Sequence, residues 1–303
     1  MIQNHKVDTN VRPVIVHYHI FKNAGTTIDG ILEKNFGQRL AYLHGERADS
    51  TVTNTDLLQF LHTNPKIMAV SSHHLRLPKP QSESFFFFEI IFLRHPLDRL
   101  RSTYDFYRRA EIITDPLGVQ ARQLDLGHFA ELLLTRYPHL VNDAQVNCLA
   151  NAGRYAQAPS DQDLEKAVRV ATQAAVPGVT ELFDLSMSAA KYCLYPVFGY
   201  LDLRYVKQNV SSSRLESLEA RLHHMKQACG PSLYDKLLEL NTLDLQLIEH
   251  TSKEIQRRLR YTPNSGAKMS YKRARDGRDC TFFTRVLSFL RHRVKGDPME
   301  GSD

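Results

Sequence analysis

An apolar segment that runs directly into a short polar loop and then into an amphipathic segment constrains this chain more than any other feature. Val14-Ile15-Val16 predicts a buried strand, and the apolar residues of 28–36 recur at helical spacing. The loop between them carries one lysine, a glycine and two threonines. A loop that leads from a strand into a helix N-terminus directs backbone N–H groups at an anion, and the helix dipole favours its charge. The predicted phosphate-binding residues are Lys22, Asn23, Ala24, Gly25, Thr26 and Thr27.

This loop differs from the phosphate loop of nucleotide triphosphatases. That loop ends in Gly-Lys-Ser/Thr, and its hydroxyl binds magnesium. In this chain Lys22 precedes Gly25, and Gly-Lys-Ser/Thr occurs nowhere. The loop therefore favours a phosphate-bearing donor other than ATP, with an ordinary strand–helix turn and a surface lysine as the structural alternative.

A second segment repeats the combination of a buried strand and a charged loop. Residues 85–93 are apolar apart from Glu89 and predict a parallel strand that is buried on both faces. Pro96 suits the first turn of the helix that follows. Arg94 then stands at the carboxyl end of the strand, where a guanidinium can bind a phosphate through two hydrogen bonds. Ser102 follows about two helical turns later.

Together the two segments resemble the sulfotransferases that use 3′-phosphoadenosine 5′-phosphosulfate (PAPS). The closest likeness is to the carbohydrate-type branch, sulfotransferase family 2, with the heparan 2-O and chondroitin enzymes and their bacterial relatives. Lys22 to Thr27 match the family loop Lys-x-Gly/Ala-Gly-Thr-Thr/Ser, and residues 94–104 match its motif Arg-x-Pro-x-x-Arg-x-x-Ser-x-Tyr. Weaker similarities extend the resemblance over residues 13–260; they lie at 142–149, 179–184, 209–211 and 243–245.

The resemblance implies a fold and a mechanism. The fold is α/β, P-loop-like and three-layered, with a central parallel sheet flanked by helices. The implied reaction is in-line transfer of the sulfuryl group of PAPS to a hydroxyl, most naturally of a glycan, without a metal. In the family's scheme Lys22 stabilises the leaving group, while Arg94 and Ser102 hold the 3′-phosphate. Residues 211–214 are a candidate for closing over the nucleotide.

A histidine pair follows the strand predicted between the two motifs. Residues 66–72 predict that strand, and His73 and His74 come directly after it. In the resembling enzymes a histidine or glutamate near this strand end acts as the base, so His73 is the predicted base. Bacterial relatives often have glycine where this chain has Ser72, and His74 therefore stays an alternative. An ordinary surface pair of histidines is the structural alternative.

The net charge of the 303 residues resides in the C-terminal segment. The chain carries +6, and residues 268–295 alone, with nine Lys/Arg and two Asp, carry +7, which leaves −1 for the rest. We therefore predict a sulfotransferase domain over 1–262, without nucleic-acid binding, and a basic extension over 263–303. The extension has an amphipathic pattern in residues 282–294, suited to an anionic membrane or an acidic glycan. A helix packed on the body is the plainer interpretation.

Other features bound the protein class. A run of about 18 apolar residues is absent and the N-terminal residues lack an apolar core, so we expect a cytoplasmic, bacterial enzyme, with the basic extension as its route to a membrane surface. The four cysteines show neither metal-binding nor disulfide spacing. Two other functions stay open, namely an ATP-dependent kinase-like phosphotransferase and a non-catalytic module that binds a nucleotide or another anion.

The rest of the pattern is mostly helical, and alternating strands and helices predict a parallel sheet covered on both faces. Residues 176–179 predict a further strand. The predicted helices are 56–62, 129–136, 143–150, 164–175, 181–194, 214–228 and 233–259.

Overall fold

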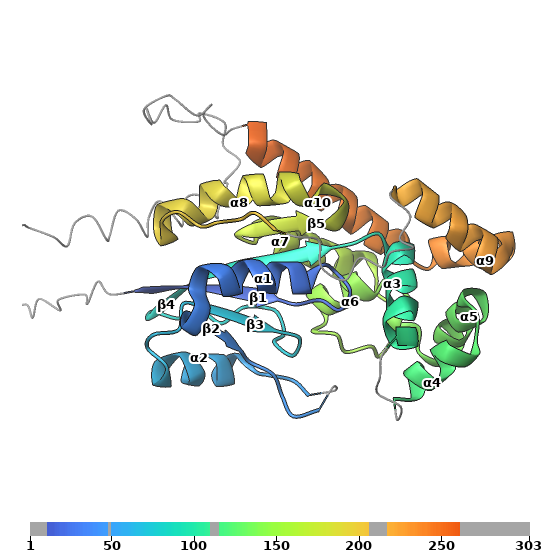
Figure 1. Cartoon of the computed structure of the whole chain (residues 1–303), viewed down its shortest axis with the longest axis horizontal. Coiled ribbons are helices and arrows are strands. Elements are labelled where there is room, and N and C mark those ends of the chain that lie inside the picture. Colours follow the sequence, from blue (N-terminus) through green and yellow to red (C-terminus); the bar gives the residue numbers. More distant parts are fainter. Residues whose placement is uncertain (1–10, 48–49, 110–114, 206–216, 261–303) are drawn as a thin grey trace, which may run out of the picture.

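A computed structural model describes residues 11–47, 50–109, 115–205 and 217–260 of the chain (Figure 1). Within these residues five strands form one all-parallel sheet in the order β2-β3-β1-β4-β5. The strands are β1 (Arg12–Tyr18), β2 (Leu40–Tyr42), β3 (Ala69–Ser72), β4 (Phe85–Leu93) and β5 (Val176–Val179). The predicted α/β fold, a central parallel sheet flanked by helices, is confirmed.

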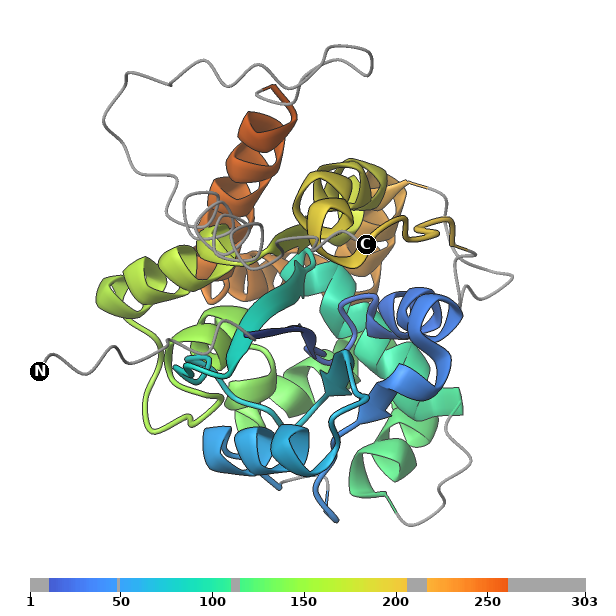
Figure 2. The ribbon, with the colours of Figure 1, turned by 90° about the vertical axis from the view of Figure 1, so that its left-hand side faces the viewer.

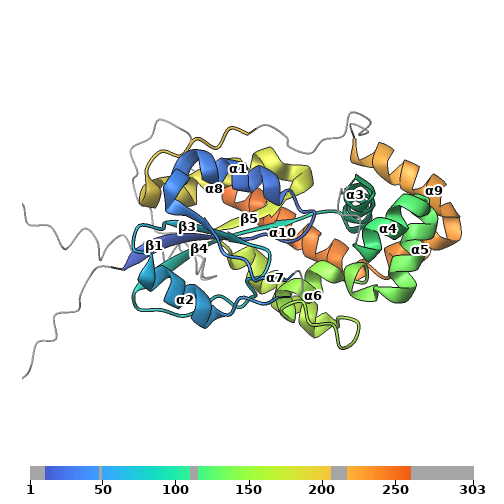
Figure 3. The same cartoon turned by 60° about the horizontal axis from the view of Figure 1, so that its bottom comes forward.

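Helices cover both faces of this sheet (Figure 3). Ile15 and Phe88 point to one face, where they pack with apolar residues of α1 and α8. Val14, Val16 and Phe87 point to the other face and pack with α2, α6, α7 and α10. Seen from the end where β1 begins, α1 and α8 lie together, apart from α2 (Figure 2). These helices are α1 (Gly25–Phe36), α2 (Asn54–Thr63), α6 (Ala144–Ala150), α7 (Asp161–Gln173), α8 (Phe183–Phe198) and α10 (Thr242–Arg260).

A third group of helices lies beyond the carboxyl ends of the strands (Figure 1). Its core is separate from the two faces of the sheet and includes Leu97, Phe129 and Leu237. The group consists of α3 (Pro96–Arg109), α4 (Pro116–Gln123), α5 (Leu126–Arg136) and α9 (Leu218–Glu239). Short 3₁₀ turns complete the described elements: η1 (Gly37–Arg39), η2 (Pro138–Leu140) and η3 (Thr180–Leu182).

The strand order creates a switch point at β1. From β1 the chain forms β2 and β3 on one side, and it then crosses to form β4 and β5 on the other. In open α/β sheets ligands bind outside the carboxyl ends of the strands at such a point. The loop of residues 19–24 follows β1, and Arg94 follows β4, so both predicted phosphate-binding segments reach this crevice.

The structure corrects the predicted elements in three places. Sequence patterns missed β2, which has only three residues, and α4, which begins after the capping residue Asp115. The predicted break at residues 229–232 is confirmed, because Gly230, with a φ of 72°, has a non-helical backbone and divides α9 into two helical segments. The helix predicted over 233–259 is wrong in its continuity, because α9 ends at Glu239 and α10 begins at Thr242. Residues 209–214, the start of the helix predicted over 214–228, and the basic extension at 263–303 lie outside the described residues.

Candidate functional site

The loop after β1 has backbone geometry that suits an anion. Lys22 and Ala24 both have positive φ values, 66° and 62°, which side-chain-bearing residues rarely adopt. Alternation of left- and right-handed residues makes a concave nest of N–H groups, and such strain collects at functional sites. The N–H groups of Asn23 and Thr27 donate to the carbonyls of Ile20 (3.2 Å) and Ala24 (3.0 Å). Ala24 is the N-cap residue of α1, so the predicted phosphate donors of residues 22–27 all lie within three residues of the helix start.

The Lys22 side chain is partly buried among aromatic rings. Its Nζ lies 4.7 Å from the centre of the Phe106 ring and 5.7 Å from that of Phe21. Burial, together with the positive charges of Arg94 and Arg109, lowers the pKa of Lys22 to about 8. A nearby phosphate stabilises a poorly solvated ammonium more than it stabilises an exposed lysine, because charges interact more strongly where water is excluded.

Gln145 of α6 joins the two predicted phosphate segments. Its buried side-chain amide pairs with the backbone of Arg94 through bonds of 2.9 Å in both directions. The Gln145 Oε1 atom also accepts a 2.8 Å bond from Asn23 Nδ2, which in turn donates to the Phe92 carbonyl at 2.9 Å. Gln145 Nε2 also donates a 3.0 Å hydrogen bond to Asp244 Oδ2 of α10. Gln145 and Asp244 come from the segments 142–149 and 243–245, which gave only weak sequence similarity.

Arg94 belongs to a buried network of charges. Its Nε and Nη2 atoms each lie 2.8 Å from Asp98 Oδ2, and its Nη1 donates to the Lys22 carbonyl at 3.0 Å. On the other side of Asp98, Arg221 of α9 donates from Nε to Oδ1 at 2.7 Å. Burial alone would raise the pKa of Asp98, but the two arginines outweigh it and lower the pKa. Ser102, half-buried, lies further along α3.

Arg221 is a residue that sequence analysis missed. Its side chain is only 9% exposed, and it pairs with a residue 123 positions earlier in the chain. The surrounding helix pattern marks Arg221 only as one charge among many. Its burial against Asp98 is visible only after α9 has packed on α3.

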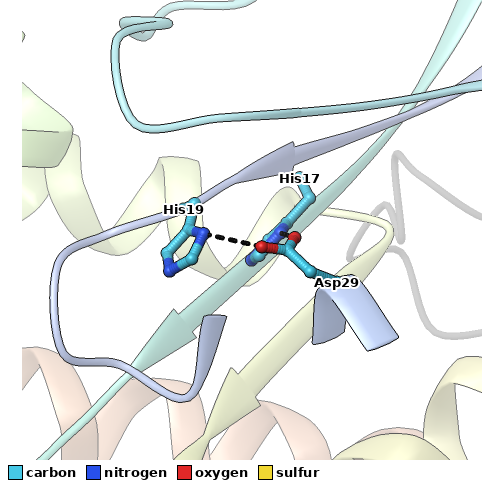
Figure 4. A group of neighbouring side chains, drawn as sticks. All are labelled: His17, His19 and Asp29. Atoms are coloured by element: carbon cyan, nitrogen blue, oxygen red, sulfur yellow. Dashed lines mark hydrogen bonds and ion pairs between the residues drawn. The ribbon is translucent and has the colours of Figure 1, made fainter. Parts of the chain in front are cut away.

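Beside the loop, one carboxylate, Asp29, contacts a row of histidines whose rings pack in the order His17, His19, His73 and His44. Figure 4 shows Asp29 with His17 and His19. Asp29 of α1 lies 2.9 Å from His17 Nδ1 and 3.1 Å from His19 Nδ1, each through a different oxygen. Ser71 Oγ donates to Asp29 Oδ1 at 2.6 Å. Burial would raise the pKa of Asp29, but these hydrogen bonds outweigh it and hold the pKa well below its ordinary value. Asp29 is therefore a carboxylate at neutral pH.

The hydrogen bonds of His73 and His74 separate the two base candidates. His73 Nδ1 lies 2.9 Å from the carbonyl of His19, so it must carry the hydrogen, which leaves Nε2 with a lone pair. His74 Nδ1 instead accepts the Gly45 N–H at 2.7 Å, so its hydrogen is on Nε2. Neutral His73 therefore has a lone pair on Nε2 that can accept a proton, whereas neutral His74 carries a hydrogen on its Nε2.

The basicity of His73 is low. Although the residue reaches the surface, burial of its ring, followed by the charges of His19 and His44, lowers its pKa to about 4. The His73 ring packs on the His19 ring with centroids 3.7 Å apart, and His44 stacks beyond it at 5.6 Å. The predicted base thus lies in the histidine row but would hold a proton only weakly.

His17, His19 and Asp29 are the one group among the described residues with three metal-binding atoms within 4.8 Å of one another. Each imidazole Nδ1 faces its own carboxylate oxygen at hydrogen-bond distance. A metal ion would instead need the lone pairs of both nitrogens to converge on one point. The arrangement therefore fits hydrogen bonds, and the expectation of a metal-free reaction stays a prediction.

The fold and the site define an α/β protein in which a strand–loop–helix turn with the geometry of an anion-binding loop lies at the switch point of the sheet. Comparison with known families agrees with this assignment. The model of the sulfotransferase family matches residues 5–156, half of the chain, and includes both phosphate segments and the histidine row. The chain belongs to the sulfotransferase family, and it is a transferase of the sulfotransferase type.

One relative covers most of the fold. An uncharacterized protein of the archaeon Archaeoglobus fulgidus is 29% identical over 241 residues, which span 78% of this chain and 95% of that protein. Because the matched stretch is longer than residues 5–156, the similarity extends past the family match.

Proposed function

We propose that this protein transfers the sulfuryl group of PAPS to a hydroxyl of a carbohydrate. The observation that carries the proposal is the 3.0 Å hydrogen bond from Arg94 to the carbonyl of Lys22, which joins the two phosphate segments at the switch point. A donor with phosphate at both ends of its ribose needs two such segments side by side. ATP lacks the 3′-phosphate that the second segment would bind.

The donor supplies a sulfuryl group on a phosphate leaving group, and residues of the loop would stabilise the charge that develops there. Lys22 would neutralise the oxygen between sulfur and phosphorus. Backbone N–H groups of the loop, among them those of Ala24 and Gly25, would hold the 5′-phosphate at the N-terminus of α1.

Arg94 and Ser102 would bind the 3′-phosphate. Three N–H groups of Arg94 are engaged by Asp98 and the Lys22 carbonyl, and the guanidinium has five. Two remain to meet a phosphate, while Asp98 and Arg221 fix the plane of the guanidinium. Such a preorganised group binds without further loss of side-chain freedom.

One imidazole of the histidine row would remove the acceptor's proton. His73 is the first candidate because its Nε2 lone pair is available. General-base catalysis requires the base to reach the hydroxyl and to have a suitable pKa, and the pKa of His73, about 4, meets the second requirement poorly.

A test should compare donors on the full-length protein. Purified protein is incubated with sulfur-35-labelled PAPS, or with γ-labelled ATP and magnesium, and with neutral and uronate-containing oligosaccharides. We expect label transfer from PAPS alone. Magnesium-dependent transfer from ATP would support the kinase-like alternative. Tight binding of adenosine 3′,5′-bisphosphate without transfer to any acceptor would support the binding module.

The remaining expectations concern location and partners. The described helices contain none that is both long and apolar enough to cross a membrane. We propose that the basic extension at 263–303 gives the protein its contact with an anionic membrane surface or an acidic glycan. Loss of binding to such a surface on removal of that extension would be the supporting result.

A further inference from the structure

The side of the loop that faces away from Arg94 holds an imidazole backed by a carboxylate. His19 follows β1, and its Nδ1 lies 3.1 Å from Asp29 Oδ2 of α1 (Figure 4). Because Asp29 remains ionised, Nδ1 carries the hydrogen of neutral His19, and Nε2 keeps the lone pair. This pairing is the one that orients and strengthens an imidazole base in enzymes.

The Nε2 edge of His19 faces the phosphate loop. A Cβ atom added to Gly25 would lie 1.8 Å from His19 Nε2 and 1.9 Å from its Cδ2. Only glycine therefore lets the ring rest against the loop at the start of α1. The His19 side chain nevertheless retains 10% of its exposure, so the ring is not sealed inside the protein. The basic nitrogen thus lies beside the N–H groups proposed to hold the 5′-phosphate.

The neighbours of His19 differ from those of His73. Asp29 brings a full negative charge to His19, whereas His73 Nδ1 donates its hydrogen bond to a neutral group, the His19 carbonyl. His17, on the other oxygen of Asp29, is fully buried, and burial lowers its pKa, so it stays neutral. Ser71 also donates to Asp29. An imidazolium at position 19 would therefore face one carboxylate and two neutral imidazoles.

We propose that His19, oriented by Asp29, is a further catalytic residue that takes the proton of the acceptor hydroxyl, with His73 packed beside it. The inference rests on the proposed function. The acceptor oxygen forms a bond to sulfur as the bond between sulfur and the 5′-phosphate oxygen breaks. The electron pair of that bond leaves on the phosphate, and the hydroxyl proton moves to His19 Nε2. Asp29 keeps its charge, and His19 later gives the proton to water.

The first experiment separates His19 from His73 by turnover. Full-length wild type, His19→Gln, His73→Gln and the control His250→Gln, an exposed histidine on α10, are given PAPS with water as the acceptor. Release of adenosine 3′,5′-bisphosphate is followed, and calorimetry gives the affinity for that product. We expect His19→Gln to lose about 10²–10⁴-fold in turnover. Its affinity for the product should stay near wild type, and His73→Gln should lose less turnover.

The second experiment does not depend on activity. Nitrogen-15 NMR of histidine-labelled protein reports which ring nitrogen carries hydrogen, and the His19 signal is assigned by its loss in His19→Gln. We expect the Nδ1–H tautomer in wild type. In the positioning variant Asp29→Asn we expect that preference to weaken and turnover to fall, again with product affinity retained.

Three results would overturn the inference. The first is wild-type turnover by the His19→Gln variant. The second is a His19→Gln variant in which turnover and product affinity fall together, because that would mean that His19 only supports the structure of the loop. The third is an Nε2–H tautomer of His19 in wild type. A wild type that never turns over PAPS would overturn the proposed function itself, and this inference with it.

Discussion

Two carboxylates, the buried Asp98 and the half-buried Asp29, lie near the phosphate loop, and their partners differ. Asp98, on the first turn of the helix after β4, lies between the guanidinium groups of Arg94 and Arg221. Asp29, on the helix after β1, lies between the imidazoles of His17 and His19. Each carboxylate thus holds two basic side chains, and both networks reach the same crevice.

The difference lies in what the partners can do with a proton. A guanidinium stays charged in proteins, so the Asp98 network keeps its positive charge and a rigid, planar set of N–H donors. An imidazole changes protonation state near neutral pH, so the Asp29 network can accept a proton and release it. One loop is thus bordered by a network suited to hold phosphate and a network suited to exchange a proton.

The largest expected effect tests the charged network. Asp98→Ala removes the carboxylate that binds two buried guanidinium groups, and we expect it to destabilise the protein by about 3–5 kcal/mol in urea unfolding. Asp29→Ala leaves imidazoles that can stay neutral, so its loss should be nearer to about 1–3 kcal/mol. Asp235→Ala, at an exposed site on α9, is the control. Equal losses for Asp98→Ala and Asp29→Ala would remove the distinction between the networks.

The next effect tests the charge inside the loop. Lys22→Met keeps an apolar stem against Phe106 but removes the ammonium, and we expect transfer from PAPS to fall by about 10²–10³-fold. Lys191→Met, on the exposed side of α8, should leave transfer unchanged. Near-normal turnover by Lys22→Met would exclude this lysine from stabilising the leaving group.

A smaller effect concerns the 3′-phosphate. Arg94→Ala should weaken binding of PAPS more than binding of adenosine 5′-phosphosulfate, which lacks that phosphate, by about 1.5–3 kcal/mol. Damage to the loop would weaken both nucleotides equally, so the difference measured by calorimetry isolates the 3′-phosphate. Ser102→Ala should show the same selectivity to a lesser degree. Equal losses for both nucleotides would mean that Arg94 only supports the loop.

The smallest effect is a shift in pH dependence. The Lys22 ammonium loses its proton as the pH rises through its pKa of about 8, so kcat/KM should fall above that pH. Arg109 contributes to the lowered pKa of Lys22 by repulsion, and Arg109→Gln should therefore move the fall to higher pH. Arg108→Gln, which removes the neighbouring arginine over Tyr104, should not move it. A profile that stays flat up to pH 9 would show that Lys22 does not limit activity.

Much of the donor side could be predicted from sequence because each part is local. Apolar runs predicted β1 and β4, and residues that follow them directly, from Lys22 to Thr27 and at Arg94, lie at the carboxyl ends as expected. A signal for the acceptor side also existed. His17 and His19 are two residues apart, so an extended strand places both on the face that α1 covers. Without the packing of α1, Asp29 could not be singled out as their partner.

The sequence by itself determined the parallel sheet, the loop after β1 and the arginine after β4, since apolar runs and turn residues act over a few positions. Only the tertiary structure decided which distant groups complete the site. Gln145 reaches Asn23 across 122 positions, and Arg221 reaches Asp98 across 123. Contacts of this kind depend on how helices pack, which periodicity along one segment does not encode. The tautomers of His19, His73 and His74 likewise follow from partners that only the folded chain supplies.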